Sequence, residues 1–238
     1  EGIDSAHKLS IMSSIAFSKI IPMDKIFVEG ISDIKLIDIA IAKEFNCVIK
    51  LLAIAKKHGN DAEVRVHPTM LPKTNTLAQV NGVFNAVYIK SDKTGPTLHY
   101  GRGAGSEATG AAVAGDIINM ARNITAGISV RTPVLGYTEE RKNLNIIDIK
   151  DINSSFYMRL TVEDMPGVLA KVGLILANNN ISVSSALQRE SASDTGCVPL
   201  VFMTHDTKGS NIMNAVQEIN SQPFVKEKTV VIRVEGGR

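Results

Sequence analysis

The chain has 238 residues, 26 Lys and Arg against 24 Asp and Glu, and a formal net charge of +2. An apolar fraction of 44% and a charged fraction of 21% are those of an ordinary globular protein, which excludes disordered and fibrous classes. The even charge balance, with aromatics at only 5% and no Trp, argues against nucleic-acid and membrane partners.

The first half of the chain predicts helices at its ends and strands between them. Apolar side chains three and four apart predict helices over 4–20 and 33–44, the second capped by Ser32 and Asp33. Apolar or alternating segments predict strands over 47–55, 62–68, 83–90 and 96–100. A glycine-rich turn over 101–110 leads into a helix at about 108–123. This order indicates an α+β fold, with a mixed sheet and helices packed on it.

The second half predicts a separate, smaller module. Residues 126–153 contain Gly, Pro and a run of charges and are interpreted as a linker. Beyond it we expect, in order, a strand over 156–162, a helix over 167–178, strands over 181–189 and 197–204, a helix over 208–220 and a strand over 226–234. That βαββαβ order is the ferredoxin-like arrangement. The expected domains are therefore 1–125 and 154–238.

The first predicted helix carries a candidate acid–base pair. Asp4 and Lys8 are four residues apart and share one helix face. A lysine beside an apolar helix face can be desolvated and poised for proton transfer, with the carboxylate one turn away holding a substrate. The alternative is structural: Asp4 as a cap and Lys8 as a surface cation.

Two turns before predicted helices could hold anionic groups. In the first, which ends at Gly105, glycines allow close approach to the backbone. The known nucleotide-binding patterns are incomplete there, because Ser106 stands where one pattern requires Gly and Ala111 stands where the other requires Lys. It predicts one wall of a cofactor site, or a tight turn. In the second, Asp164 to Gly167, free N–H groups of the next helix could take an amino-acid carboxylate, or the turn is an ordinary one.

Cysteine and histidine give no metal site. The five histidines lack partners at ligand spacing, so no catalytic metal is predicted. Cys47 and Cys197 lie far apart, and Cys47 is within an apolar run, which indicates a reduced, cytoplasmic protein with buried thiols.

Five separated segments resemble the homoserine dehydrogenase family in order and spacing. They begin at Glu1 (EGIDSAHKL), Val48 (VIKLLAIA), Val66 (VHPT), Gly82 (GVFNAV) and Tyr100 (YGRGAG). Residues 155–235 resemble an ACT domain, a ferredoxin-like module that senses amino acids. The family's N-terminal Rossmann domain has no counterpart in these residues, so the chain resembles a C-terminal fragment, expected to be inactive alone.

The resemblance implies interconversion of aspartate 4-semialdehyde and homoserine with NAD or NADP. It implies that Lys8 donates the proton to the substrate oxygen, that Asp4 binds the substrate and that Gly105 contacts the nicotinamide cofactor. It also implies a homodimer or homotetramer. The alternative kept open is a non-catalytic regulator that binds amino acids.

For the ACT domain, the resemblance implies an amino-acid effector bound at the first strand-to-helix turn and a neighbouring second strand. Threonine is the first choice, with methionine or isoleucine second. The residues implied in this site are Asp164, Met165, Gly167, Val168, Asn180 and Ile181.

Overall fold

A computed structural model describes residues 1–128, 135–189 and 196–236. By its contacts the chain forms two compact units, one of residues 1–72 with 141–238 and the other of residues 73–140. These units differ from the segments expected from sequence, 1–125, 126–153 and 154–238, whose independent folding stays a prediction. Part of the expected linker, 129–134, lies outside the described residues.

The first unit is built around a long buried strand, β3 (Asp61–Pro72), which pairs antiparallel with β2 (Cys47–His58) along its whole length. The other edge of β3 is covered in turn by three short parallel partners: β6 (Asn145–Ile146), β1 (Phe27–Val28) and β11 (Val230–Val234). Because β11 also pairs with β7 (Asn153–Glu163), the sheet runs without interruption into the βαββαβ half.

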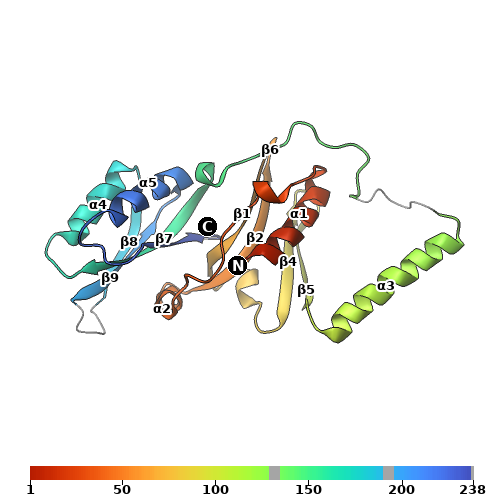
Figure 1. The fold of residues 1–238 in the computed structure, drawn as a ribbon, viewed down its shortest axis with the longest axis horizontal. Coiled ribbons are helices and arrows are strands. Elements are labelled where there is room, and N and C mark those ends of the chain that lie inside the picture. Colours follow the sequence, from red (N-terminus) through yellow and green to blue (C-terminus); the bar gives the residue numbers. More distant parts are fainter. Residues whose placement is uncertain (129–134, 190–195, 237–238) are drawn as a thin grey trace. The chain divides into compact units, whose positions relative to one another are not determined.

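The βαββαβ half has the order expected from the sequence (Figure 1). Its sheet is completed by β9 (Cys197–Thr204), β8 (Val183–Gln188) and the short β10 (Thr207–Lys208). Alternate β7 side chains, including Met158 and Leu160, form one core with α4 (Val168–Asn178) and α5 (Gly209–Asn220). The opposite face of β7 is buried as well, and Tyr157 packs there with α2 (Leu36–Glu44).

Two details of the first helices differ from the sequence predictions. In α1 (Ile3–Phe17) the buried side chains are mostly small, Ala6 and Ser13 among them, while Ile11 and Ile15 are exposed. Small residues let the helix lie close to β2 and β3. Of the apolar residues whose spacing predicted this helix, Ala6 and Leu9 are buried as expected, and Ile11 and Ile15 are not. Helix α2 begins after Lys35, whose N–H donates to the Asp38 carboxylate, so Ser32 and Asp33 are not its cap.

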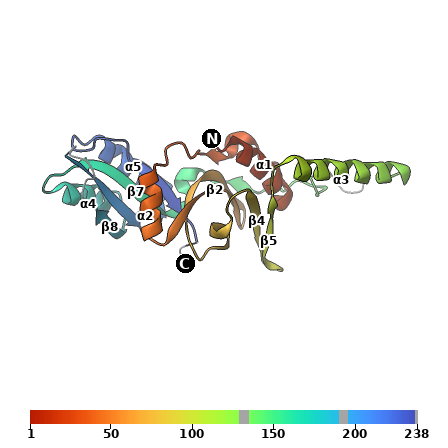
Figure 2. The same cartoon turned by 90° about the horizontal axis from the view of Figure 1, so that it is seen from below.

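The second unit contains one antiparallel hairpin and one long helix (Figure 2). The hairpin joins β4 (Phe84–Ser91) to β5 (Gly95–Arg102), and the rings of Phe84 and Tyr100 stack across it. Helix α3 (Ser106–Thr125) follows, and none of its side chains is buried. Three short 3-10 helices complete the described elements of both units: Met23–Lys25, Thr76–Gln79 and Ile149–Asp151.

These elements confirm the predicted fold class: a mixed sheet with helices packed on it, followed by a ferredoxin-like βαββαβ module. The elements expected in the strand-rich parts are all present, with ends that move by a few residues. What the sequence did not indicate is that strands of the two halves pair in one sheet.

Candidate functional site

The predicted pair at the start of α1 comes together in the structure. Lys8 Nζ lies 2.6 Å from Asp4 Oδ2 on one helix face. Gly2, which precedes the helix, has a φ of 86°, and a Cβ there would lie 3.1 Å from the Val28 side chain and 3.3 Å from that of Val66. Glycine at this position therefore lets the first turn of α1, with Asp4, lie directly against β1 and β3.

The pair is open to solvent within the described residues. The Lys8 and Asp4 side chains keep 66% and 80% of their accessible surface, so the apolar surroundings expected for Lys8 are not found there. An exposed ion pair contributes little to stability. The arrangement is therefore free to act on a ligand: an ammonium group that can give up a proton, beside a carboxylate that can accept hydrogen bonds.

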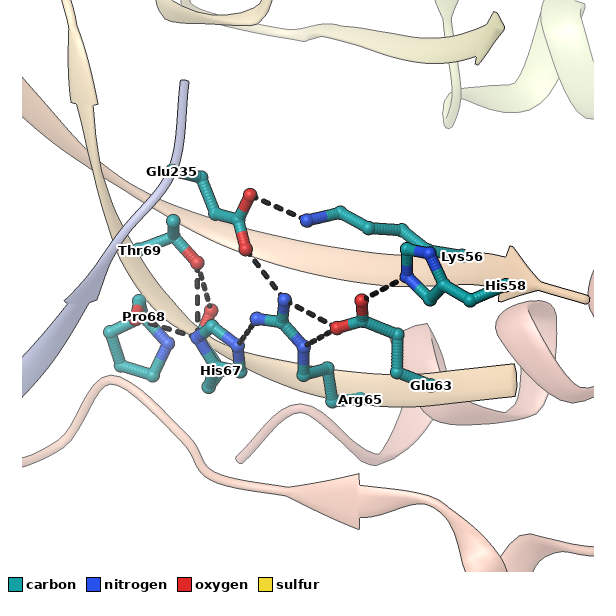
Figure 3. Close-up of polar contacts among 8 residues, drawn as sticks. All are labelled: Lys56, His58, Glu63, Arg65, His67, Pro68, Thr69 and Glu235. Atoms are coloured by element: carbon teal, nitrogen blue, oxygen red, sulfur yellow. Dashed lines mark hydrogen bonds and ion pairs between the residues drawn. The ribbon is translucent and has the colours of Figure 1, made fainter. Parts of the chain in front are cut away.

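A buried polar network lies on one face of β2 and β3 (Figure 3). Its centre is Arg65, whose side chain is 1% exposed and donates to Glu63 at 2.9 Å and to Glu235, just beyond β11, at 2.5 Å. Lys56 Nζ lies 2.8 Å from the other oxygen of Glu235. The two cations and two carboxylates balance, which a buried cluster of charges requires.

His67 belongs to this network and is fixed as a neutral base. Arg65 lies 2.7 Å from its Nε2, so Nε2 must accept, and the proton is on Nδ1, which donates to the Pro68 carbonyl at 2.9 Å. Burial and the Arg65 charge lower the pKa of His67 to about 3. A histidine held in one tautomer and uncharged at neutral pH is a structural acceptor for Arg65.

The carboxylates of the network stay charged despite their burial. Burial alone would raise the pKa values of Glu63 and Glu235, but the Arg65 charge and hydrogen bonds outweigh it and lower both. Lys56 adds to the effect at Glu235. The network therefore ties β3 to the end of the chain with ionised groups that are all paired.

A second buried network joins α2 to β7. Arg159 makes a bidentate contact with Asp38, donating from Nε to Oδ1 at 2.6 Å and from Nη2 to Oδ2 at 3.1 Å. The Tyr157 hydroxyl also donates to Oδ1, at 2.9 Å. Asp38 is fully buried. Burial and the Asp38 charge raise the pKa of Tyr157, so it stays protonated and donates. This network fixes α2 on the face of the βαββαβ sheet opposite α4 and α5.

Sequence reasoning missed both networks. In β3, Glu63, Arg65 and His67 alternate with apolar residues, which is the pattern of a strand with one face in solvent. No local signal in the sequence indicates that Glu235, 170 residues from Arg65, closes the network. An opposite-charge pair two residues apart, Glu63 and Arg65, is the one hint, since such a pair shares a strand face.

The glycine-rich turn lies in the second unit, directly before α3. Gly105 has a φ of 116°, which favours glycine, and a Cβ added to it would meet no atom within 4 Å. The backbone there is open to approach, and the first turn of α3 provides N–H groups without helical acceptors. These features fit a single contact with an anionic or planar ligand.

The predicted effector turn has the geometry of a helix start. Gly167 has a φ of 88°, precedes α4 and has open space where a Cβ would lie. Gln188 of β8 donates to the Asp164 carboxylate at 3.3 Å. Met165 is about half exposed, whereas Val168 is buried in the core.

The other two residues predicted there lie beyond the far end of α4. Asn180 has a left-handed φ of 56°, and the N–H of Ile181 donates to the Leu176 carbonyl at 2.9 Å. Ile181 is buried in the same core as Val168. The structure thus places these six residues at the two ends of one helix, and their role in binding stays a prediction.

No group of three or more His, Cys, Asp or Glu is placed to hold a metal ion in the described ranges. Within the same ranges, no helix is long and apolar enough to cross a membrane. Cys47 is buried, as expected, and its thiol donates to the Phe45 carbonyl at 3.3 Å, whereas Cys197 is only half-buried.

The fold and site define an α+β protein in which a βαββαβ module continues the sheet of a preceding domain. The homoserine dehydrogenase family model matches residues 1–118, and the ACT domain model matches residues 156–224. Residues 1–118 therefore form a homoserine dehydrogenase family domain and residues 156–224 an ACT domain, as the resemblance implied.

Individual relatives agree. The chain is 38% identical over 236 residues to a homoserine dehydrogenase from Pseudomonas aeruginosa, covering 99% of this chain and 54% of that protein. A crystal structure of a homoserine dehydrogenase from Thiobacillus denitrificans matches with a TM-score of 0.88 and 38% identity, over 99% of this chain and 53% of that one. One from Staphylococcus aureus matches with a TM-score of 0.66 and 27% identity. The chain spans about half the length of these relatives.

Proposed function

We propose that this chain is the substrate-binding and regulatory part of a homoserine dehydrogenase, which interconverts aspartate 4-semialdehyde and homoserine. The observation that carries the proposal is the Asp4–Lys8 pair, 2.6 Å apart at the start of a helix in the family-matched region. The alternative, a non-catalytic amino-acid-binding regulator, is not favoured, because the relatives that match almost the whole chain are homoserine dehydrogenases.

Lys8 and Asp4 have different roles in this proposal. When the aldehyde carbon of the semialdehyde receives a hydride, negative charge develops on its oxygen. Lys8 neutralises that charge by donating a proton from Nζ. Asp4 accepts hydrogen bonds from the substrate and holds the ammonium group of Lys8 in place. In the reverse direction Lys8 takes the proton back from the homoserine hydroxyl.

The hydride is supplied by a nicotinamide cofactor, NAD or NADP, in the proposed reaction. The residues of this chain fit one contact with it, the open backbone at Gly105. The sequence contains no complete glycine-rich phosphate-binding motif in the described turn, where Ser106 follows Gly105. We therefore expect the phosphates and the choice between NAD and NADP to depend on another part of the enzyme.

The ACT domain is proposed to bind an amino-acid effector, threonine first and methionine or isoleucine second. The N–H groups at the start of α4 suit a carboxylate, since they carry the positive end of the helix dipole. Asp164 would take the ammonium group, and Asn180 a side-chain hydroxyl. The proposal also includes a homodimer or homotetramer and a cytoplasmic location.

The 238-residue chain alone should show no turnover of homoserine with NAD or NADP, because among its described residues we propose a cofactor contact at Gly105 alone. The whole enzyme, in which a nucleotide-binding domain precedes this chain, should turn over both substrates. The measurement is absorbance of the reduced nicotinamide with purified proteins at equal concentration. Inactivity of the whole enzyme on homoserine, with turnover of a different hydroxy acid, would contradict the proposed substrate.

The Gly167→Asp variant should lose threonine binding, measured by calorimetric titration beside the parent chain. An aspartate there adds bulk and a repelling charge where the ligand carboxylate is expected, and it strains a backbone with a φ of 88°. Gly173→Asp is the matched control, since Gly173 lies inside the same helix and has equally open surroundings. Threonine binding that survives in Gly167→Asp would remove this turn from the effector site.

A further inference from the structure

A cavity of about 530 Å³ lies within the first unit, between the loop that follows β1 and the ACT domain. One wall is formed by Phe27 and residues 29, 30 and 32–35, and the other by β11 and the apolar side chains of α5, such as Ile212 and Val216. Cavities of this volume commonly hold small molecules. It lies apart from the α4 turn, none of whose predicted effector residues lines it.

Arg233 of β11 is the unusual group in this cavity. Its guanidinium carbon lies 5.3 Å from the ring centres of both Phe27 and Phe156. Its Nε is buried without a hydrogen-bond partner, and no ion pair of the described residues includes it. Burial and the nearby charge of Arg65 lower its pKa to about 10, so it remains a cation at neutral pH. A partly buried guanidinium without an ion-pair partner is costly unless an anion binds to it.

The opposite charge in the cavity is Glu29. Its carboxylate is partly buried, and burial, with Asp33 nearby, raises its pKa despite the charges of Arg233 and Lys228. The charge of Arg233 acts on the Glu29 carboxylate, but the two side chains form no ion pair in the described structure. Two exposed residues that also line the cavity, Asp33 and Lys228, are a second anion and a second cation.

The remaining charges that line the cavity are already neutralised. Lys35 Nζ lies 2.8 Å from Glu227. The lining thus leaves one inner cation and one inner anion unpaired, beside an apolar wall. This balance suits a ligand with a negative and a positive group, and it disfavours a multiply charged anion such as a nucleotide.

We propose that this cavity is a second amino-acid site, which binds a free aliphatic α-amino acid between the homoserine dehydrogenase domain and the ACT domain. Its carboxylate pairs with Arg233, its ammonium group with Glu29, and its side chain packs on α5. Arg233 lies on β11, the strand that pairs with β3. A bound amino acid therefore stabilises the contact between the two domains.

The test is calorimetric titration of the 238-residue chain with L-methionine, an unbranched aliphatic probe, followed by its amide and its deaminated analogue. We expect saturable binding of L-methionine, and binding at least about tenfold weaker for each analogue, since each lacks one charge-assisted hydrogen bond. Thermal unfolding should shift upward with L-methionine, since a ligand that binds only the folded chain stabilises it. If L-methionine, L-leucine and L-isoleucine all fail to bind, the proposal is overturned.

Variants separate this site from the α4 turn. Arg233→Met and Glu29→Gln should each weaken L-methionine binding at least about tenfold, while Gly167→Asp should leave it unchanged. Arg233→Met should keep its fold, because it replaces a partly buried cation that forms no ion pair by an apolar side chain of similar length. Arg122→Met, which removes an exposed guanidinium from α3, is the matched control. Binding lost in Gly167→Asp but kept in Arg233→Met and Glu29→Gln would assign the ligand to the α4 turn and overturn the proposal.

Discussion

In the whole enzyme, Lys8→Ala should lower kcat by about 10²–10⁴-fold, the range usual for loss of a general acid. The reason is that no other cation is placed beside Asp4 in the described residues: Lys8 is its one ion-pair partner there. Homoserine binding should suffer less, since Lys8 acts on charge that develops only in the transition state. The measurement is steady-state kinetics in both directions.

Lys8→Arg separates proton transfer from charge. Arginine keeps the positive charge but gives up a proton far less readily, so this variant should remain nearly as slow as Lys8→Ala. Asp4→Ala should instead raise KM, because its proposed role is to hold the substrate. Lys43→Ala, which removes an exposed lysine from α2, is the control and should be unaffected. A near-normal kcat for Lys8→Ala would make Lys8 a surface cation and disprove the assignment.

Much of the fold could be predicted because its signals are local. The apolar run from Cys47, the turn at Gly59 and the βαββαβ order after 154 each follow from residues close together in the sequence. The spacing of Asp4 and Lys8 likewise predicts that they meet on one helix face, as they do. Helical periodicity and strand alternation operate over a few residues, so a single sequence displays them.

The parts that could not be predicted depend on contacts distant in the sequence. The pairing of β11 with β3 sets Arg233 beside Thr69, and no nearby residue indicates it. The burial of Asp38 follows from Arg159, which lies 121 residues away. For α1, the spacing of Ile11 and Ile15 fits a helix but does not show which face is buried, because small residues can also pack closely.

The contact between α2 and β7 should depend on the charge of Asp38. Asp38→Asn should lower the free energy of unfolding by about 3–5 kcal/mol, because it removes the buried counter-charge of Arg159 and leaves only the longer contact, 3.9 Å, with the half-exposed Glu227. Asparagine keeps the shape of the side chain and can still accept the Lys35 N–H, so the loss reports the charge and not the helix cap. Chemical denaturation, followed by circular dichroism, measures it.

A matched pair of variants shows whether burial is the reason. Glu44→Gln removes a carboxylate from the same helix, but Glu44 is exposed in its pair with Arg189, so its loss should cost at most about 1 kcal/mol. The double variant Asp38→Leu with Arg159→Met should recover most of the stability lost in Asp38→Asn, because two well-packed apolar side chains can replace a buried ion pair. If Asp38→Asn costs no more than Glu44→Gln, α2 is not held to the ACT sheet by this network. The burial of both faces of β7 would then depend on the apolar contacts of Tyr157 and its neighbours alone.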